Sequence, residues 1–194
     1  MKAMLLAGAA VLALALPSPA AAALISTSAS LTGGAENPAV PTLGTGSAIV
    51  VLDTVAHTLS VNFSFAGLTG DTTVAHIHCC IAPPGNVGVA SAVPSFPGFL
   101  AGVKAGIYSQ VFDTTLASTW NPAFITANGG TPLGAEAALA AGLLAGTAYL
   151  NVHSTFRPGG EIRGFLEVPE PASLALLATG LLGLAGVRRR MATG

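Results

Sequence analysis

Apolar and polar side chains alternate with a period of two in the middle of the chain. The alternation is clearest at 58–65, where apolar residues occupy every second position, and in the more apolar run 47–52 the residues Ala48, Val50 and Leu52 share one face. Side chains of a strand point alternately to its two faces, so these runs predict half-buried strands. The polar link 53–58 joins them as a short hairpin connection.

Three more segments, 73–78, 149–153 and 161–166, combine the same alternation with polar residues on one side. The Pro- and Gly-rich stretches 83–86 and 94–106 are typical of loops. The pattern therefore predicts an all-β fold, an antiparallel β-sandwich of the Greek-key type.

One or two short helical insertions interrupt this pattern. The segment 134–144 is rich in Ala and Leu, and Gly146 follows it as a helix stop. A second short helix is expected at 122–127.

The first 23 residues have the layout of a secretory signal peptide. Lys2 precedes an apolar run that ends in a small-residue cleavage zone at 20–23. A retained membrane anchor is the alternative, although the run is short for a span of about 20 residues.

A second apolar run, 172–187, lies near the C-terminus and measures 16 residues. It follows Pro169-Glu170-Pro171 and precedes Arg188-Arg189-Arg190. An arginine cluster stays in the cytoplasm under the positive-inside rule, so the run predicts a short transmembrane helix with the main chain outside. A buried amphipathic helix is the alternative.

Pro-Glu-Pro, a short apolar helix and a terminal arginine cluster resemble the PEP-CTERM sorting signal, here at 169–190. The resemblance implies recognition by exosortase in a Gram-negative bacterium that makes exopolysaccharide. It also implies export by the secretion machinery, transient anchoring in the inner membrane, and processing near Pro169–Pro171. The mature protein would reach the cell surface or the extracellular matrix.

The composition of residues 24–168 differs from that of the whole chain, because both apolar terminal segments are left out. The whole chain has only 8% charged residues and a mean hydropathy of +0.70, which alone suggests a membrane protein. The span 24–168 carries three cationic and seven anionic residues, a net charge of −4. This charge argues against a nucleic-acid partner, which requires a basic face. About 145 residues suffice for one domain with its own core.

Three predicted strands carry polar side chains on one face. His76 and His78 are two positions apart and share a face, with Ile77 on the other. The same spacing places Asn151 beside His153, and Glu161 beside Arg163. If these strands are neighbours, one face carries three imidazoles, a carboxylate and a guanidinium.

Same-face histidines on a strand can converge on a metal ion. With His153 as a third ligand, His76 and His78 would form a set suited to copper or zinc. The alternative is a hydrogen-bonded polar network without an ion. His57 falls in a turn-like segment and is expected at the surface.

Cys79 and Cys80 are adjacent, and three states stay open for them. They could form a vicinal disulfide, because export reaches an oxidising compartment. They could remain thiols and join the histidines at a soft metal such as Cu(I). They could also be small buried residues without a further role.

We expect no enzymatic activity, since no set of nucleophile, base and acid is visible. Ser154 follows His153 and therefore points to the opposite face of its strand. Glu36 and Glu161 would form a glycosidase-like carboxylate pair only if the fold brought them together.

Four motifs in order resemble the CHRD domain, first described in chordin. They are 31–38 (LTGGAENP), 75–78 (AHIH), 149–154 (YLNVHS) and 158–164 (PGGEIRG). The resemblance covers about 25–167 and implies a domain at 24–168. The His-x-His strand is also similar to the copper-ligand strand of Cu/Zn superoxide dismutase, a β-sandwich, but the zinc loop of that enzyme has no counterpart here.

These observations favour an exported, non-enzymatic structural or binding module at the surface or in the matrix. Exopolysaccharide or surface proteins would be its partners. A copper- or zinc-binding extracellular protein that uses His76, His78 and His153 is the alternative.

Replacing Glu170 should leave the precursor unprocessed in a host that has exosortase, because the substitution removes the acidic residue of the sorting motif. The size of the exported chain measures the processing. Normal maturation of the variant would contradict the sorting assignment.

Overall fold

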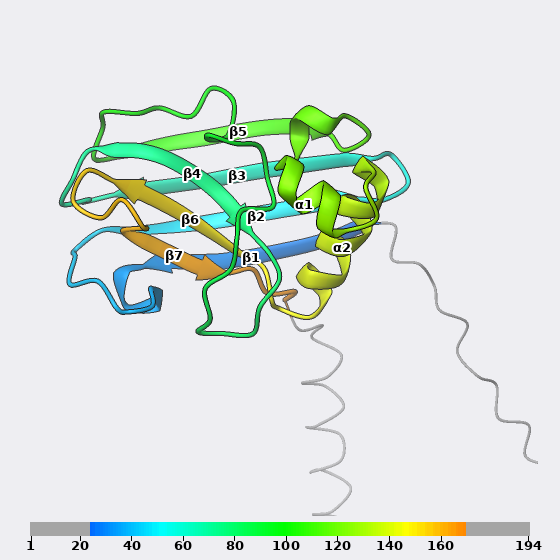
Figure 1. Cartoon of the computed structure of the whole chain (residues 1–194). Coiled ribbons are helices and arrows are strands. Elements are labelled where there is room, and N and C mark those ends of the chain that lie inside the picture. The colour runs from blue at the N-terminus through cyan, green and yellow to red at the C-terminus, as the bar shows by residue number, and fades with distance from the viewer. Residues whose placement is uncertain (1–23, 170–194) are drawn as a thin grey trace, which may run out of the picture.

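The computed structural model describes residues 24–169 (Figure 1). The predicted signal peptide, and the sorting tail beyond Pro169 with its apolar run and arginine cluster, lie outside the described residues. Within the described range, no helix has the length and apolar character needed to cross a membrane.

Seven antiparallel strands form one curled sheet in the order β4-β6-β7-β1-β2-β3-β5, with two α-helices at one end (Figure 1). The strands are β1 (Leu24–Thr32), β2 (Thr45–Asp53), β3 (Thr58–Ala66), β4 (Thr72–His78), β5 (Gly106–Asp113), β6 (Tyr149–Ser154) and β7 (Ile162–Phe165). The helices are α1 (Pro122–Ala127) and α2 (Pro132–Leu144), and short 3-10 turns lie at Gly33–Ala35 (η1) and Ala117–Thr119 (η2).

The all-β antiparallel class and both helices are confirmed, but the expected pair of packed sheets is wrong. Strand β1 pairs with β2 along its whole length and also with β7, through Thr32 and Arg163. This double pairing joins all seven strands into one sheet. A half-buried strand shows the same alternation in a sandwich and in a curled sheet, so the sequence pattern could not separate the two.

Two strands, β1 and β5, have no counterpart in the sequence prediction. Strand β1 is rich in Ser and Thr, and one of its buried positions is Thr27. In β5 only Tyr108 is fully buried, while Ile107 and Val111 are exposed. In β1 the polar Thr27 interrupts the buried face that Ile25 and Leu31 begin and end, and β5 contributes only Tyr108 and the partly buried Phe112. The apolar alternation is therefore weaker in these two strands than in the others.

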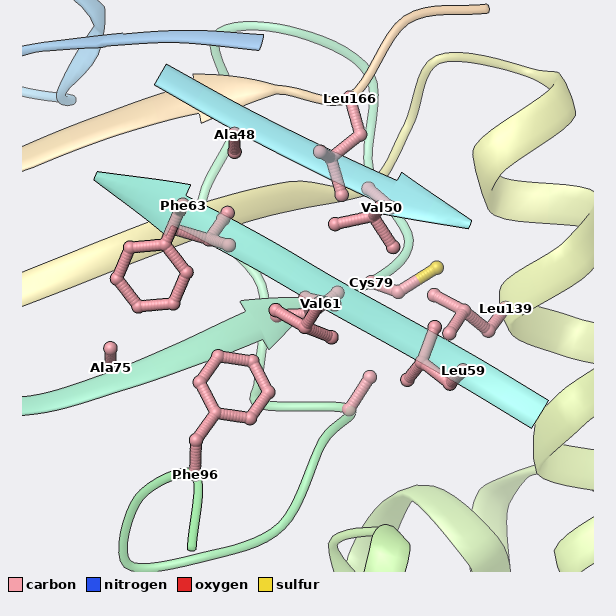
Figure 2. Close-up of a cluster of buried hydrophobic side chains, with 14 of the residues drawn as sticks. Ala48, Val50, Leu59, Val61, Phe63, Ala75, Cys79, Phe96, Leu139 and Leu166 are labelled. Atoms are coloured by element: carbon pink, nitrogen blue, oxygen red, sulfur yellow. The ribbon is translucent and has the colours of Figure 1, made fainter. Parts of the chain in front are cut away.

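The apolar core fills the concave side of the sheet. Val50, Val61 and Ile77 are completely buried there, and the labelled side chains of Figure 2 converge between the strands. The predicted loop 94–106 contributes to this core. Its Phe96 ring lies 6.2 Å from the ring of Phe63, between centroids. The loop therefore packs into the curl of the sheet.

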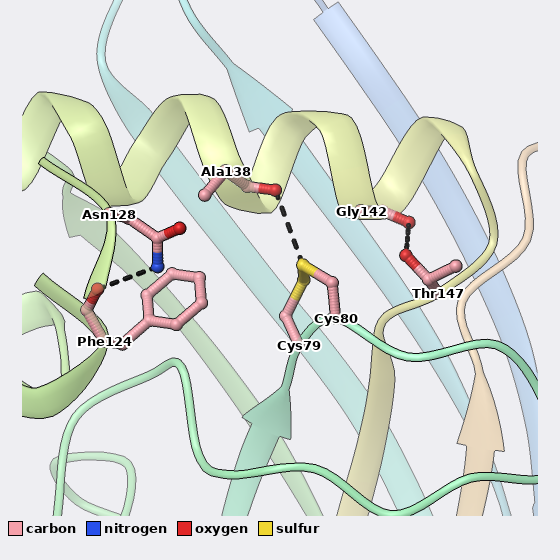
Figure 3. The surroundings of a disulfide bond; sticks show 7 residues. All are labelled: Cys79, Cys80, Phe124, Asn128, Ala138, Gly142 and Thr147. Atoms are coloured by element: carbon pink, nitrogen blue, oxygen red, sulfur yellow. Dashed lines mark hydrogen bonds between the residues drawn. A yellow bond between two sulfur atoms is a disulfide. The ribbon is translucent and has the colours of Figure 1, made fainter.

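Helix α2 begins at a standard cap and packs against a disulfide. The hydroxyl of Thr131 accepts a hydrogen bond from the backbone N–H of Gly134. Near its end, Gly142 faces the disulfide between Cys79 and Cys80, whose Cys80 Sγ lies 3.6 Å from the carbonyl of Ala138 (Figure 3). A methyl group at Gly142 would clash with both sulfur atoms, Cys79 Sγ and Cys80 Sγ.

Gly142→Ala should therefore destabilise the fold. Alanine normally stabilises a helix interior by about 0.5–1 kcal/mol relative to glycine. Here we expect a loss of about 1–3 kcal/mol from overpacking against the disulfide. Urea unfolding of the two chains measures the difference.

The control repeats the comparison with both cysteines replaced by alanine. Without the sulfur atoms, Gly142→Ala should become neutral or stabilising. An equal loss in both backgrounds would show that the disulfide does not set the identity of residue 142.

Candidate metal centre

The polar side chains of β4, β6 and β7 form a layer that is itself buried. His76 of β4 pairs in register with Asn151 of β6, which pairs in turn with Arg163 of β7. Directly paired residues share a face, so these three form one row across the sheet. Backbone carbonyls of the loops around residues 35, 84–94 and 158 accept hydrogen bonds from this layer. The predicted shared face exists, and loops cover it.

Three histidines meet within this layer. His76, His78 and His153 are 5%, 8% and 7% exposed. One ring nitrogen from each lies within 4.8 Å of the others. His76 Nδ1 and His153 Nε2 are 3.4 Å apart. The spacing predicted from the sequence therefore brings these three side chains together.

The opposite nitrogen of each ring bonds to a backbone carbonyl. A carbonyl can only accept, so in each case the ring nitrogen carries the proton and donates it. The bonds are His76 Nε2 to Pro94 O at 2.7 Å, His78 Nδ1 to Val87 O at 2.8 Å, and His153 Nδ1 to Pro158 O at 2.8 Å.

These bonds fix the tautomers and leave three lone pairs facing one another. They belong to His76 Nδ1 and His153 Nε2, which lie 3.4 Å apart, and to His78 Nε2, the ring nitrogen that the bond to Val87 leaves free. His78 Nε2 has no hydrogen-bond partner. His76 Nδ1 and His153 Nε2, 3.4 Å apart, both carry a lone pair and no proton, so neither neutral ring donates a hydrogen bond to the other.

Burial also keeps the three imidazoles neutral. Removal from water lowers the pKa of His76 and of His153, although the bond to a carbonyl opposes the shift in each case. The same cause lowers the pKa of His78 to about 4. At neutral pH all three rings are therefore in the form that binds metal.

The geometry fits one ion. Zinc lies about 2.0 Å from imidazole nitrogens, which places three such nitrogens about 3.3–3.5 Å apart. The separation of His76 Nδ1 from His153 Nε2 already matches, and His78 needs a small inward shift. Carbonyl acceptors behind the rings are the second-shell partners that metal-binding histidines usually have. Cys79 and Cys80 form the disulfide at α2, so the alternative in which their thiols join the site does not hold in this structure.

Arg163 and Tyr149 support the cluster from the side. Arg163 is completely buried, and its guanidinium lies 4.7 Å from the centroid of the Tyr149 ring. That ring stacks on His78 at 4.7 Å with an angle of 5° between the planes. Sequence reasoning missed Tyr149, although it lies two positions before Asn151 and so shares its face.

Glu161, expected on the same face, has other partners. Its carboxylate accepts hydrogen bonds from the hydroxyls of Thr42 and Ser154 and from the backbone N–H groups of Thr69 and Gly70. Burial raises the pKa of Glu161, but these bonds outweigh it and hold the pKa below its ordinary value. Glu161 therefore anchors loops and does not belong with the histidines.

Glu36, and not Glu161 as expected, is the carboxylate beside Arg163. Its Oε2 lies 3.7 Å from Nε of Arg163. Burial raises the pKa of Glu36 to about 7, and Arg163 lowers it only in part. Because Glu36 and Glu161 have separate partners, no contact supports a glycosidase-like pair.

His57 is less exposed than expected. Its Nδ1 lies 3.0 Å from the buried carboxylate of Glu136 on α2, and its side chain is 39% exposed. Glu136 also accepts a hydrogen bond from the Thr114 hydroxyl. The pair ties the turn between β2 and β3 to α2, which the turn-like sequence around His57 did not indicate.

Glu36→Gln should change how stability depends on pH. A carboxyl group whose pKa is higher in the folded state stabilises the fold fully below the unfolded pKa and loses this contribution as pH rises through the folded pKa. Between pH 4 and pH 8, the free energy of unfolding of the native chain should fall by up to about 3 kcal/mol relative to the variant. Parallel curves for the two chains, measured by urea unfolding, would contradict this.

Comparisons with known proteins agree with the two resemblances in the sequence. The model of the CHRD domain matches residues 27–166, and that of the PEP-CTERM protein-sorting motif matches residues 167–190. Neither a curated protein nor a solved structure matches the chain. The sorting motif implies export and cell-surface sorting through exosortase. Since the first match covers most of its length, the chain belongs to the CHRD domain family.

Proposed function

We propose that this exported CHRD protein holds one copper or zinc ion through His76 Nδ1, His78 Nε2 and His153 Nε2. The observation that carries the proposal is the convergence of three buried lone pairs without a hydrogen-bond donor between them. The ion would be a resident part of a binding or structural module at the cell surface or in the matrix.

A metal ion accounts for the cluster better than a plain polar network does. A buried polar atom left without a partner costs about 1–3 kcal/mol. In a network, one ring would have to donate to another, but all three ring protons are already directed to Pro94, Val87 and Pro158. A cation at the centre provides a partner for every lone pair at once.

Burial supports a binding role over catalysis. Each of the three histidines is more than nine-tenths buried. Five cavities within residues 24–169 are lined by residues other than these histidines. An ion held there would connect the loops that carry Val87, Pro94 and Pro158, and so stabilise the covered face.

The direct test is metal content per chain. The protein, exported to an oxidising periplasm and purified without chelator or His-tag, should carry about one copper or zinc ion. His76→Ala/His78→Ala and His153→Ala should each lose the ion. His57→Ala is the matched control, because it removes an imidazole outside the cluster and should keep the ion.

Thermal unfolding gives a second measure. A ligand that binds only the folded state at 100 times its dissociation constant stabilises it by about 2.7 kcal/mol. Added metal should therefore raise the melting temperature of the wild type and of His57→Ala. It should leave the melting temperatures of His76→Ala/His78→Ala and of His153→Ala unchanged. A wild-type chain that takes up neither Cu(II) nor Zn(II), or triad variants that bind as well as the wild type, would overturn the proposal.

A further inference from the structure

The two edges of the curled sheet differ in their cover. Strand β4 forms one edge and strand β5 the other (Figure 1). An edge strand presents unpaired N–H and C=O groups, which can pair with a strand of another chain unless something covers them. At the β4 edge the loop 89–103 supplies that cover, because the carbonyls of Thr72, Ala75 and Ile77 accept hydrogen bonds from its backbone N–H groups.

The β5 edge has no such cover. The N–H of Thr114 donates to the carbonyl of His57 directly opposite, so this pair is a hydrogen-bonded one. Bonded and non-bonded pairs alternate along an antiparallel ladder, so the N–H and C=O groups of Ile107, Ser109 and Val111 point away from β3. Within the described part of the chain, no group forms a hydrogen bond with them.

Side chains along β5 also leave this edge open to a partner. Ile107 and Val111 are 78% and 65% exposed, and Ser109 and Gln110 are exposed as well. Proteins usually protect an edge strand with a proline, a charged side chain or a bulge. Residues 106–112 contain no proline and no charge, and their register against β3 is continuous. Strand β5 therefore carries none of these protections.

The sequence of β5 is self-complementary about Ser109. When a strand pairs antiparallel with its own copy, a two-fold axis relates the two strands. If Ser109 lies opposite Ser109 of the second copy, Ile107 lies opposite Val111, and the outward N–H and C=O groups face one another. Apolar pairs across two strands stabilise a sheet. The neighbouring registers would instead place Ile107 opposite Ser109 or opposite Asp113.

Charge at the ends of β5 favours the same register. Lys104 precedes the strand and is exposed, and Asp113 ends it. Hydrogen bonds from Thr115 lower the pKa of the Asp113 carboxyl, so this group is ionised at neutral pH. The register centred on Ser109 sets Asp113 opposite Ala105 of the other copy, next to Lys104. Two such pairs of opposite charge flank the dimer interface.

We propose that two copies of this chain pair through their β5 strands, antiparallel and centred on Ser109, so that their sheets become continuous. A single pair of strands is a small interface, and the dimer therefore forms reversibly as the concentration of the chain rises. The three histidines lie on β4 and β6, away from β5 in the strand order, so the dimer does not depend on a bound ion.

Sedimentation velocity of the exported chain, kept in detergent with its sorting tail, tests the proposal. The average mass should rise from one chain toward two across the micromolar range. Val111→Lys sets a charge opposite Ile107 and should raise the dissociation constant at least about tenfold. Ile49→Lys is the matched control, because Ile49 is 54% exposed on β2, away from the edge, and this variant should dimerise as the native chain does.

Cross-linking tests the register. Directly opposite Cα atoms in a hydrogen-bonded antiparallel pair are about 5.5 Å apart, within the range of about 4.4–6.8 Å that a disulfide spans. Ser109→Cys should therefore form a disulfide-linked dimer on mild oxidation, seen by non-reducing electrophoresis. Ser28→Cys, at an exposed position of β1 in the same sheet, is the control and should remain a single chain.

Three results would overturn the proposal. The first is a mass that stays at one chain over the whole concentration range. The second is dimerisation that Val111→Lys leaves unchanged, which would place the interface elsewhere on the protein. The third is equal cross-linking of Ser109→Cys and Ser28→Cys. Metal content, measured in the same samples, separates failure of this proposal from failure of the proposed metal site.

Discussion

The buried guanidinium of Arg163 is the interaction on which the covered polar face and the candidate metal centre depend. A charge without access to water needs a partner for each of its N–H groups, and breaking such a set is strongly destabilising. Arg163 donates to backbone carbonyls of η1 and of the loop after β4, and to the side chain of Asn86. It thereby holds the loop whose Val87 carbonyl fixes the tautomer of His78, and its Nε lies 3.7 Å from the carboxylate of Glu36.

The single curled sheet explains why a polar layer can be buried at all. The sheet curls (Figure 1), and its apolar core lies on one side of it. The side chains that alternate with the core residues of β4, β6 and β7 therefore face the opposite side. Loops cover that side and supply backbone carbonyls to its donors. The fold thus surrounds His76, His78 and His153 with acceptors for one side of each ring and leaves the other sides directed at one another.

Alternation was enough to predict five of the seven strands, and Ala- and Leu-rich composition with Gly146 as a stop was enough to predict the longer helix. It also placed His76 with His78, and Asn151 with His153, on shared faces. It could not show that β1 joins the two halves into one sheet, because pairing partners leave no mark on a half-buried strand. The exchange of Glu161 for Glu36 and the role of Tyr149 depend on loop positions and ring stacking, which only the three-dimensional structure reveals. The lone pairs became visible only once the carbonyl partners of the rings were known.

Anomalous diffraction from crystals of the metal-loaded protein, recorded at the copper and zinc absorption edges, tests the central claim most directly. The account predicts one peak about 2.0–2.2 Å from each of three specific atoms, namely Nδ1 of His76 and Nε2 of His78 and His153. It also predicts that the three opposite ring nitrogens keep their bonds to the carbonyls. No peak at the cluster, or a peak bound through the opposite nitrogens, would contradict the account.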